Sequence, residues 1–302
     1  MPDPAGRKTQ PHLFCFGLGY SAGTLADSLL QRGWRVSGTC RSMEKTAQLT
    51  ARGITPYLFD RNQPIDRLNQ HLADVTHLLS SVPPDAAGDP VIDLHGALLR
   101  EQRHLVWTGY LSTTGVYGDR QGDWVDEDSA LQPSGERGAR RLAAERQWLA
   151  LTPAAHLFRL AGIYGPGSSA LDTVRAGRAR NIVKPGQVFS RIHVADIVQV
   201  LLASIAQPSP GRAYNVCDDD AAPPADVILY ACKLLGVAPP PPTDFAEAAM
   251  SPMARSFYDD NKRVRNERIK QELGVDLLYP DYRLGLSAIL AAEQSSSRQS
   301  TT

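Results

Sequence analysis

The sequence lacks the features that mark a membrane, secreted or metal-dependent protein. It has no apolar run of membrane-spanning length, and its first eleven residues are polar, without the apolar core of a signal peptide. The four cysteines show no C-x-x-C spacing, and the seven histidines include no H-x-x-x-H pair. We therefore predict a cytoplasmic protein with reduced, mostly buried thiols and no metal site.

An excess of charge of one sign is also absent. The 32 basic residues balance the 32 acidic ones, and no basic or acidic block occurs. This balance argues against a nucleic-acid groove or a membrane-surface patch. The G-x-S-x-G elbow of serine hydrolases is missing as well. We expect a small-molecule substrate as partner, with no nucleic acid and no membrane, and we leave a homodimer open.

The most informative feature that is present is a glycine-rich turn near the N-terminus. A short apolar run at 13–16 leads into a Gly-x-Gly-x-x-Ala pattern, and a helical pattern follows at 22–33. One glycine makes the tight turn, the second lets the backbone approach a pyrophosphate, and the small third residue lets helix and strand pack closely. The N-terminus of the helix then directs its N–H groups at the anion. We predict dinucleotide contacts from six consecutive residues: Gly17, Leu18, Gly19, Tyr20, Ser21 and Ala22.

The end of the next strand bears on cofactor choice. Residues 35–40 fit a strand, and Arg41 follows it directly. NAD-selective sites usually carry an acid there for the ribose 2′-hydroxyl, whereas an arginine suits the 2′-phosphate of NADP. In this chain the first acid after that strand is Glu44. A guanidinium pairs with phosphate in fork geometry, so NADP is favoured over NAD. A solvated loop arginine is the alternative.

Two further residues are predicted to contact the cofactor. Asp60 closes a third strand at 55–59 and could accept a hydrogen bond from the adenine amino group; an aspartate that caps a helix or turn is the alternative. Ser81 lies at the end of a fourth strand at 76–82, where the backbone passes the cofactor.

Strand and helix patterns alternate through the first half of the chain. Strands are expected at 13–16, 35–40, 55–59, 76–82 and 104–112, with helices at 22–33, 43–52, 65–73 and 91–102. Such alternation predicts right-handed βαβ units, and therefore an α/β fold with a Rossmann doubly wound parallel sheet. After about residue 150 the pattern is mixed. It predicts strands at 158–164, 189–193 and 213–216, and helices at 194–206, 225–235, 261–273 and 281–292.

This pattern suggests the following organisation. A flexible N-terminus at 1–11 precedes a dinucleotide-binding domain at 12–165. A smaller C-terminal α/β substrate lobe at 166–293 interleaves with the sheet. A Ser-rich, disordered tail at 294–302 ends the chain.

Several separated motifs together resemble one family. They are the glycine turn, Leu111 to Gly118 (LSTTGVYG), Arg159 to Gly167, Arg191 to Ile197 (RIHVADI) and Tyr214-Asn215-Val216. In order and spacing they resemble the extended short-chain dehydrogenase/reductase superfamily, the group that contains nucleotide-sugar epimerases and dehydratases. The segments at 263–266, 273–274 and 279–283 look closer to an atypical bacterial branch, the YeeZ-like proteins.

The resemblance implies a hydroxyl residue that binds the reacting oxygen, and Thr113 has that position, with Thr114 beside it as a substrate contact. It also implies a Tyr-x-x-x-Lys pair on the next helix, in which the tyrosine exchanges a proton and the lysine binds the nicotinamide ribose. Here these positions hold Arg137 and Arg141. An arginine cannot exchange protons at neutral pH. Arg141 can still contact ribose or phosphate as a fixed cation; a surface pair with Glu145 is the alternative.

The resemblance also points to substrate contacts in the second half. Tyr117 and Tyr164 lie near strand ends, where ligands bind in open α/β sheets, although both also fit as packing aromatics. In relatives an arginine such as Arg191 binds a substrate diphosphate. His193 could carry a proton or cap the following helix. Our predicted substrate contacts are Thr114, Tyr164, Arg191 and His193.

Two functional hypotheses result. The first is an NAD(P)-dependent oxidoreductase or epimerase that acts on a sugar-nucleotide-like or small carbonyl/hydroxyl substrate. Its site would lie between the two lobes, with Thr113 polarising the reacting oxygen and the proton carrier unassigned. The second is a non-catalytic NAD(P)-binding sensor or scaffold, because the Tyr-x-x-x-Lys pair is absent.

Overall fold

The chain folds into two compact units that exchange segments along the sequence. The structure, a computed structural model, describes residues 10–299. Unit 1 comprises Met1–Thr113, Ala139–Arg159 and Leu201–Tyr214, and unit 2 comprises Thr114–Gly138, Leu160–Val200 and Asn215–Thr302. Residues 1–9 of the N-terminus that we predicted to be flexible lie outside the described residues.

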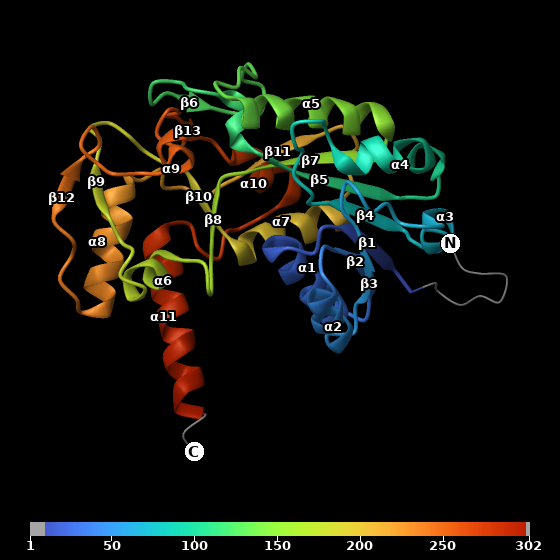
Figure 1. Cartoon of the computed structure of the whole chain (residues 1–302), viewed down its shortest axis with the longest axis horizontal. Coiled ribbons are helices and arrows are strands. Elements are labelled where there is room, and N and C mark those ends of the chain that lie inside the picture. The colour runs from blue at the N-terminus through green and yellow to red at the C-terminus, as the bar shows by residue number, and fades with distance from the viewer. Residues whose placement is uncertain (1–9, 300–302) are drawn as a thin grey trace. The chain divides into compact units, whose positions relative to one another are not determined.

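A seven-stranded sheet is the centre of unit 1 (Figure 1), and its order is β3-β2-β1-β4-β5-β7-β11. The strands are β1 (His12–Phe16), β2 (Arg35–Cys40), β3 (Thr55–Leu58), β4 (His77–Ser80), β5 (Trp107–Thr113), β7 (Ala155–Leu160) and β11 (Ala213–Val216). Neighbouring strands from β3 to β5 are parallel, with Cys15 opposite Gly38 and Phe16 opposite Ser80. This order is that of the doubly wound dinucleotide-binding fold. The predicted fold class is therefore confirmed.

Helices cover both faces of this sheet. They are α1 (Tyr20–Gln31), α2 (Met43–Ala51), α3 (Leu68–His71), α4 (Pro90–Glu101), α5 (Glu136–Leu151) and α7 (Val194–Ala206). Helices α4 and α5 lie on one side of the sheet, and α1 and α2 on the other (Figure 1). Their starts follow local rules. The Ser42 side chain accepts the Lys45 N–H, and Asp89 accepts the Val91 N–H ahead of a helix whose first residue is Pro90.

The core of unit 1 forms where α4 and α5 meet the sheet. Phe14 and Phe16 of β1 and Tyr110 of β5 are buried against α4, around Val91, and against α5, around Trp148. Each such side chain stabilises the fold by about 1.5–3 kcal/mol through burial. This core fixes the carboxyl ends of the central strands, at which the glycine turn and Thr113 lie.

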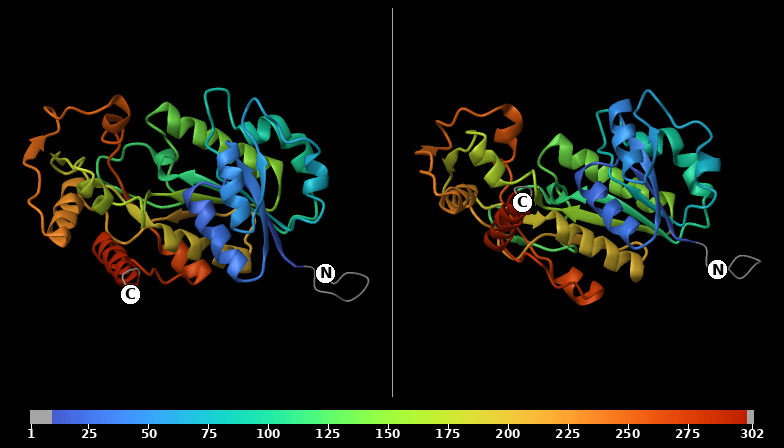
Figure 2. Two further views of the ribbon diagram at one scale, coloured as in Figure 1. Left: turned by 60° about the horizontal axis from the view of Figure 1, so that its bottom comes forward. Right: turned by 90° about the horizontal axis from the view of Figure 1, so that it is seen from below.

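Unit 2 contains short strand pairs and a helical cluster. Its strands are β6 (Trp124–Val125), β8 (Gly162–Tyr164), β9 (Asn181–Val183), β10 (Arg191–His193), β12 (Pro242–Asp244) and β13 (Arg263–Val264). Its helices are η1 (Thr114–Tyr117), α6 (Ala170–Arg175), α8 (Pro224–Leu235), α9 (Pro252–Ser256), α10 (Glu267–Leu273) and α11 (Tyr282–Gln299). The parallel pairs are β8–β10, β9–β12 and β6–β13. Helices α6, α8 and α11 pack together around Leu171 and Tyr282 (Figure 2).

Most predicted elements of both halves are present within a few residues, but three predictions were wrong. The strand predicted at 158–164 is interrupted at Ala161, because the Ala161 N–H bonds to Val216 O while the next N–H bonds to Ser190 O. The helix predicted at 261–273 begins only at Glu267, since residues 263–264 form β13 with residues 124–125. The tail predicted to be disordered from 294 is helical to Gln299, and residues 300–302 lie outside the described part.

Candidate functional site

The glycine turn of unit 1 has the geometry of a phosphate-binding turn. Gly17 has a φ of +86°, and a Cβ there would lie 3.1 Å from Val82 Cγ2. The Thr39 hydroxyl accepts the Gly17 N–H at 2.7 Å, which fixes the turn against β2. Gly19 precedes α1, and a Cβ on it would meet no atom within 4 Å. The turn is therefore closed on the protein side at Gly17 and open at Gly19, the arrangement that an approaching pyrophosphate requires.

The first turn of α1 supplies donors beside this open space. The first helical hydrogen bond runs from the Gly23 N–H to Gly19 O, at 2.8 Å. The N–H groups of Ser21 and Ala22 lie ahead of it, where an α-helix provides no internal acceptor. Both residues are buried, and the small Ala22 lets α1 pack against β1. These are the donors that we predicted for the phosphates.

Arg41 lies at the neighbouring strand end. It is exposed, directly follows β2 and precedes the helix cap Ser42. Strand β2 is bound to β1 at a close approach: a Cβ on Gly38 would lie 2.4 Å from Cys15 O. The strand that ends at Arg41 is thus held against the strand that ends in the glycine turn. Arg41 remains our predicted 2′-phosphate ligand.

Asp60 and Ser81 occupy turns at two further strand ends. Asp60 Oδ1 accepts the Asn62 N–H at 2.7 Å, and its backbone bridges Gln63, so its side chain stabilises a turn as the alternative interpretation had it. The Ser81 N–H donates to Phe16 O at 2.8 Å, which brings its backbone against the glycine turn. Whether either contacts a cofactor stays a prediction.

Arg141 contacts the strand that carries Thr113. Its guanidinium donates to Leu111 O and lies 3.4 Å from the Tyr110 hydroxyl. The alternative, a surface pair of Arg141 with Glu145, was wrong. Glu145 is 2% exposed and accepts two hydrogen bonds from Arg159, at 3.0 and 3.2 Å. Arg141 therefore fixes the end of β5 near the half-buried Thr113, and this position is compatible with its predicted role as a fixed cation.

Two further hydroxyl groups lie at the same sheet edge. Ser80 ends β4, and Ser112 precedes Thr113 in β5, the strand paired with β4. Both side-chain oxygens are buried and have no hydrogen-bond partner in the described part of the chain. The protein encloses both oxygens, so neither is open to a bound group in this structure.

The predicted substrate residues of unit 2 lie on one strand pair. Strands β8 and β10 are parallel, with His193 opposite Tyr164 and Arg191 opposite Gly162. The Tyr164 hydroxyl is 3.4 Å from Asp281 O, and burial raises the pKa of Tyr164 well above its ordinary value. Tyr164 is therefore protonated at neutral pH. Its hydroxyl also fills the space beside Gly285, where a Cβ would lie 2.1 Å away.

His193 acts on the following helix. Its Nδ1 accepts the Ala195 N–H at 3.1 Å, the capping role that the alternative interpretation gave it. Burial lowers the pKa of His193 to about 4, so the ring is neutral at pH 7. A neutral ring with an accepting Nδ1 carries its proton on Nε2. That Nε2 is buried and has no partner among residues 10–299.

Arg191 binds backbone carbonyls. Its Nη1 donates to Phe189 O at 2.7 Å and to Ala222 O at 3.1 Å. Its backbone O accepts the Asp218 N–H at 2.6 Å. These contacts hold β10 against the segment that follows β11. The role of Arg191 in diphosphate binding stays a prediction.

Asp218 is the charged residue of unit 2 that sequence reasoning missed. It is 2% exposed, and within the described chain neither carboxylate oxygen has a hydrogen-bond partner. Burial raises the pKa of Asp218 to about 8, although the positive charge of Arg191 opposes this shift. The run CDDD at 217–220 looks like a solvated turn, so the sequence carried no signal of this burial.

The remaining predicted residues of unit 2 are Thr114, Tyr117 and Arg137. Thr114 begins η1 and is half-buried. The Tyr117 hydroxyl donates to Asn215 Oδ1 at 2.7 Å in the protein interior, which is the packing role considered above. The guanidinium of Arg137, at the family's tyrosine position, lies 5.4 Å from the centre of the Phe257 ring.

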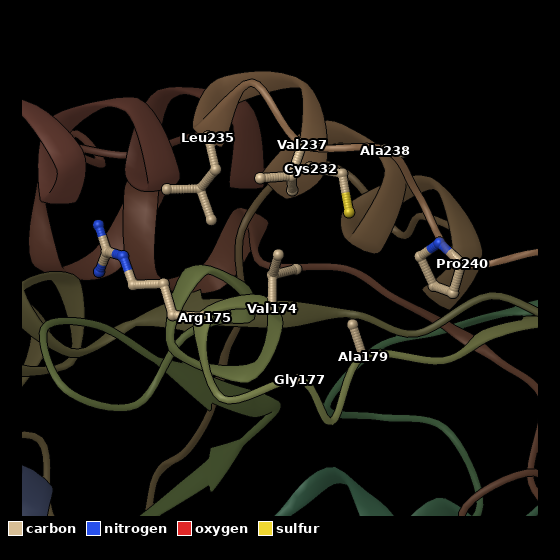
Figure 3. Close-up of a pocket in the computed structure, with 9 residues that line it drawn as sticks. All are labelled: Val174, Arg175, Gly177, Ala179, Cys232, Leu235, Val237, Ala238 and Pro240. Carbon is tan, nitrogen blue, oxygen red and sulfur yellow. The ribbon is translucent and has the colours of Figure 1, made fainter.

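Unit 2 also contains two pockets. One, of about 530 Å³, lies between α6 and the end of α8, and the side chains of Val174 and Leu235 reach into it from opposite sides (Figure 3). Its Arg175 is paired with Glu293 at 2.6 Å, so its accessible surface is mainly apolar. The other, of about 200 Å³, is polar and is lined in part by Asp218.

Two other sequence predictions concern the whole chain. All four cysteines are buried and none forms a disulfide, as predicted. Within residues 10–299, the helices fall short of the length and apolar character needed to cross a membrane.

Comparison with known proteins gives close and distant relatives. No family model matches the chain. A conserved, functionally unknown protein from Silicibacter pomeroyi DSS is 50% identical, with a TM-score of 0.87 over 94% of this chain and 99% of that one. Protein YeeZ of Escherichia coli K12 is 28% identical over 285 residues, 88% of this chain and 95% of YeeZ.

Two further structures carry functional names. A protein from Methylobacillus flagellatus, provisionally named an NAD-dependent epimerase/dehydratase, is 27% identical, with a TM-score of 0.71 over 95% of this chain and 100% of that one. UDP-glucose 4-epimerase of Thermotoga maritima, solved with UDP-glucose, has a TM-score of 0.74 over 93% of this chain and 99% of its own. At 14% identity that likeness shows the fold alone.

Proposed function

Because the chain belongs to the extended short-chain dehydrogenase/reductase superfamily, among the relatives of NAD-dependent epimerases/dehydratases and of YeeZ, we propose that it is an NADP(H)-dependent oxidoreductase or epimerase. Its substrate is a sugar nucleotide or a related small carbonyl or hydroxyl compound. The dinucleotide binds to unit 1, and residues of unit 2 recognise the substrate.

The glycine turn is the observation that carries this proposal. The positive φ of Gly17, the open space at Gly19 and the helix N–H groups behind it fit a pyrophosphate. The exposed Arg41 at the adjacent strand end fits a 2′-phosphate, because an arginine can bind it with two parallel hydrogen bonds.

The chemistry divides between the cofactor and the protein. The nicotinamide supplies or accepts a hydride when it is bound. Thr113, at the end of β5, donates a hydrogen bond to the reacting oxygen and so stabilises the charge that develops there. Arg141 holds the end of β5 through Leu111 O and thereby positions Thr113. Arg137 replaces the family's tyrosine, so a different group transfers the proton to the reacting oxygen.

A cofactor titration tests the proposal. Arg41→Ala removes a charged hydrogen-bond donor, so we expect NADPH to bind about 10- to 100-fold more weakly and NADH to bind as before. The matched control is Arg32→Ala, which removes an exposed arginine at the far end of α1. Fluorescence or calorimetric titration measures both constants. Equal losses for the two cofactors would reject Arg41 as the 2′-phosphate ligand, and failure of both to bind the wild type would reject the proposed function.

The second candidate function is an NADP(H) sensor without turnover. Two arginines at the family's tyrosine and lysine positions favour this function. Arg137 lies over the Phe257 ring, and Arg141 binds the β5 backbone. Turnover of NADPH with a panel of nucleotide sugars and small aldehydes separates the two functions. Tight NADPH binding without turnover across the panel would favour the sensor.

A further inference from the structure

The Arg61 side chain joins two loops at the carboxyl edge of the unit 1 sheet. The β3 loop (residues 59–67) contains Arg61, and the β4 loop (residues 81–89) leads into α4. The guanidinium donates through Nε to Asp85 Oδ2 at 2.5 Å and through Nη1 to Asp93 Oδ2, in the first turn of α4, at 2.8 Å. Its Nη2 donates to Gly88 O at 3.0 Å. All three nitrogen atoms of this rigid, planar group therefore bind the segment 85–93.

Each loop is also closed by a hydrogen bond of its own. In the β3 loop, Asp60 Oδ1 accepts the Asn62 N–H at 2.7 Å. In the β4 loop, the Asp85 N–H donates to Gly88 O at 2.9 Å. Because both turns are closed internally, the bonds of Arg61 fix one formed turn against the other.

The two loops carry predicted cofactor contacts. Asp60 directly precedes Arg61, and Ser81 lies four residues before Asp85. The Ser81 N–H donates to Phe16 O at 2.8 Å, so the β4 loop starts against the glycine turn. In doubly wound sheets the ligand binds outside the carboxyl ends of the strands, where these loops lie. Arg61 therefore sets the position of the Asp60 carboxylate relative to the glycine turn.

The effect of this network on global stability is small. The side chains of Arg61, Asp85 and Asp93 are 29%, 44% and 32% exposed. Ion pairs in such surroundings contribute about 0–1 kcal/mol each. The three bonds consequently act on the local geometry of the loops more than on the free energy of unfolding.

A second contact holds the β3 loop independently of Arg61. The Ile65 N–H donates to His95 Nε2 at 3.3 Å, and the Phe59 ring lies 5.6 Å from the His95 ring. Phe59 and Ile65 are both buried. Loss of the guanidinium therefore frees the turn at 60–63 without detaching the loop from α4.

We propose that Arg61 is a positioning residue for the adenine end of the dinucleotide. By joining the two loops, it holds the Asp60 carboxylate where this group accepts a hydrogen bond from the adenine amino group. The Asn62 N–H uses Oδ1 of that carboxylate and leaves Oδ2 for the amino group. The inference rests on the proposed function, because it requires a dinucleotide bound to unit 1.

Two cofactors that differ only in the purine ring test this role on the full-length protein. NADPH has an amino group on its adenine, whereas reduced nicotinamide hypoxanthine dinucleotide phosphate has a carbonyl oxygen there, which repels a carboxylate. Calorimetric titration of both gives the ratio of their affinities. In the wild type we expect NADPH to bind about 10- to 100-fold more tightly, as a hydrogen bond to a charged group predicts.

Variants then identify the role of Arg61. Arg61→Met removes all three donors and should lower the affinity ratio about 10-fold. Arg61→Lys keeps the charge without the planar geometry, so it should retain part of the ratio. The matched control is Arg35→Met, which removes the arginine that pairs with Asp74 at the opposite, amino end of the strands and should leave the ratio unchanged. Should Arg61→Met not fold, Asp85→Asn weakens the same contact from the β4 loop and is expected to lower the ratio about 3-fold.

The ratio distinguishes positioning from a general loss of structure. If Arg61 only stabilises the loops, its variants weaken NADPH and the hypoxanthine analogue equally, and an unchanged ratio would overturn the inference. A wild-type ratio near one would overturn it as well, because no recognition of the amino group would exist for Arg61 to support. In both cases NADPH still binds, so the proposed function stands. A wild type that does not bind NADPH would reject the proposed function and this inference together.

Discussion

The buried Asp218 predicts an unusual dependence of stability on pH. Its pKa is raised from 3.8 to about 8 in the folded protein, a difference of about four pH units. Between these two pH values the folded state holds a proton that the unfolded state has released. The free energy of unfolding therefore falls as pH rises. The stabilisation that comes from the protonated Asp218 is fully present below about pH 4 and is lost once pH exceeds about 8.

The size of this effect follows from the pKa difference. Each pH unit corresponds to about 1.4 kcal/mol, so the ionised carboxylate lowers the free energy of unfolding by up to about 5–6 kcal/mol. Asp218→Asn keeps the shape and removes the titration. The variant should match the wild type near pH 5 to within about 1–2 kcal/mol and exceed it by several kcal/mol near pH 9.

Urea unfolding of both proteins between about pH 5 and pH 9 measures this difference, since all other titrating groups contribute equally to the two curves. Asp220→Asn serves as the control, because its carboxylate is bound to Arg283 and partly exposed. A difference between wild type and Asp218→Asn that stays constant across this range would show that Asp218 ionises normally. The reasoning about its buried, unpartnered carboxyl group would then be wrong.

Three further predictions concern unit 1. Gly19→Val should abolish binding of NADPH and NADH, because the valine side chain fills the open space of the turn. Circular dichroism should still show a folded protein. Binding that is retained in calorimetry would place the dinucleotide elsewhere. Thr113→Val should lower turnover about 10²- to 10³-fold and leave NADPH affinity unchanged, whereas a steady-state rate equal to that of the wild type would remove Thr113 from the reaction. Glu145→Ala should lower the free energy of unfolding in urea by about 3–5 kcal/mol, because Arg159 keeps a buried, unpaired charge. The double variant Glu145→Met with Arg159→Leu should lower it much less. Similar losses in the two variants would mean that the ion pair itself stabilises the fold.

Local patterns sufficed for most of unit 1. Strand β1 before the glycine turn is fully buried, and Gly17 and Gly19 lie where the geometry needs them, so residue order alone fixes the turn. Ser42 and Asp89 cap the helices that the sequence placed after them. Short-range chemistry of this kind can be read without knowing the rest of the chain.

The errors arose where a distant segment decides the structure. The break at Ala161 exists because its N–H bonds to Val216 whereas the next N–H bonds to Ser190. Arg263 and Val264 form a strand only because residues 124–125 pair with them. Such pairings override local propensity.

Asp218 was missed for the same reason. Three adjacent acids after a strand indicate a solvated turn, and only the tertiary structure shows which of the three is buried.

The alternation of segments between the two units limits how this protein can be taken apart. Three segments of unit 1 alternate with three of unit 2, and the last segment of unit 1 supplies half of the edge strand β11 and the end of α7. A fragment cut near residue 165 would leave β7 as an open edge, prone to pair with other chains. It would also remove Ser204, whose hydroxyl accepts the Trp107 indole N–H at 3.0 Å inside unit 1. Unit 2 is therefore not a module that can be exchanged by joining gene fragments at one point, and engineering of this protein has to change residues within an undivided chain.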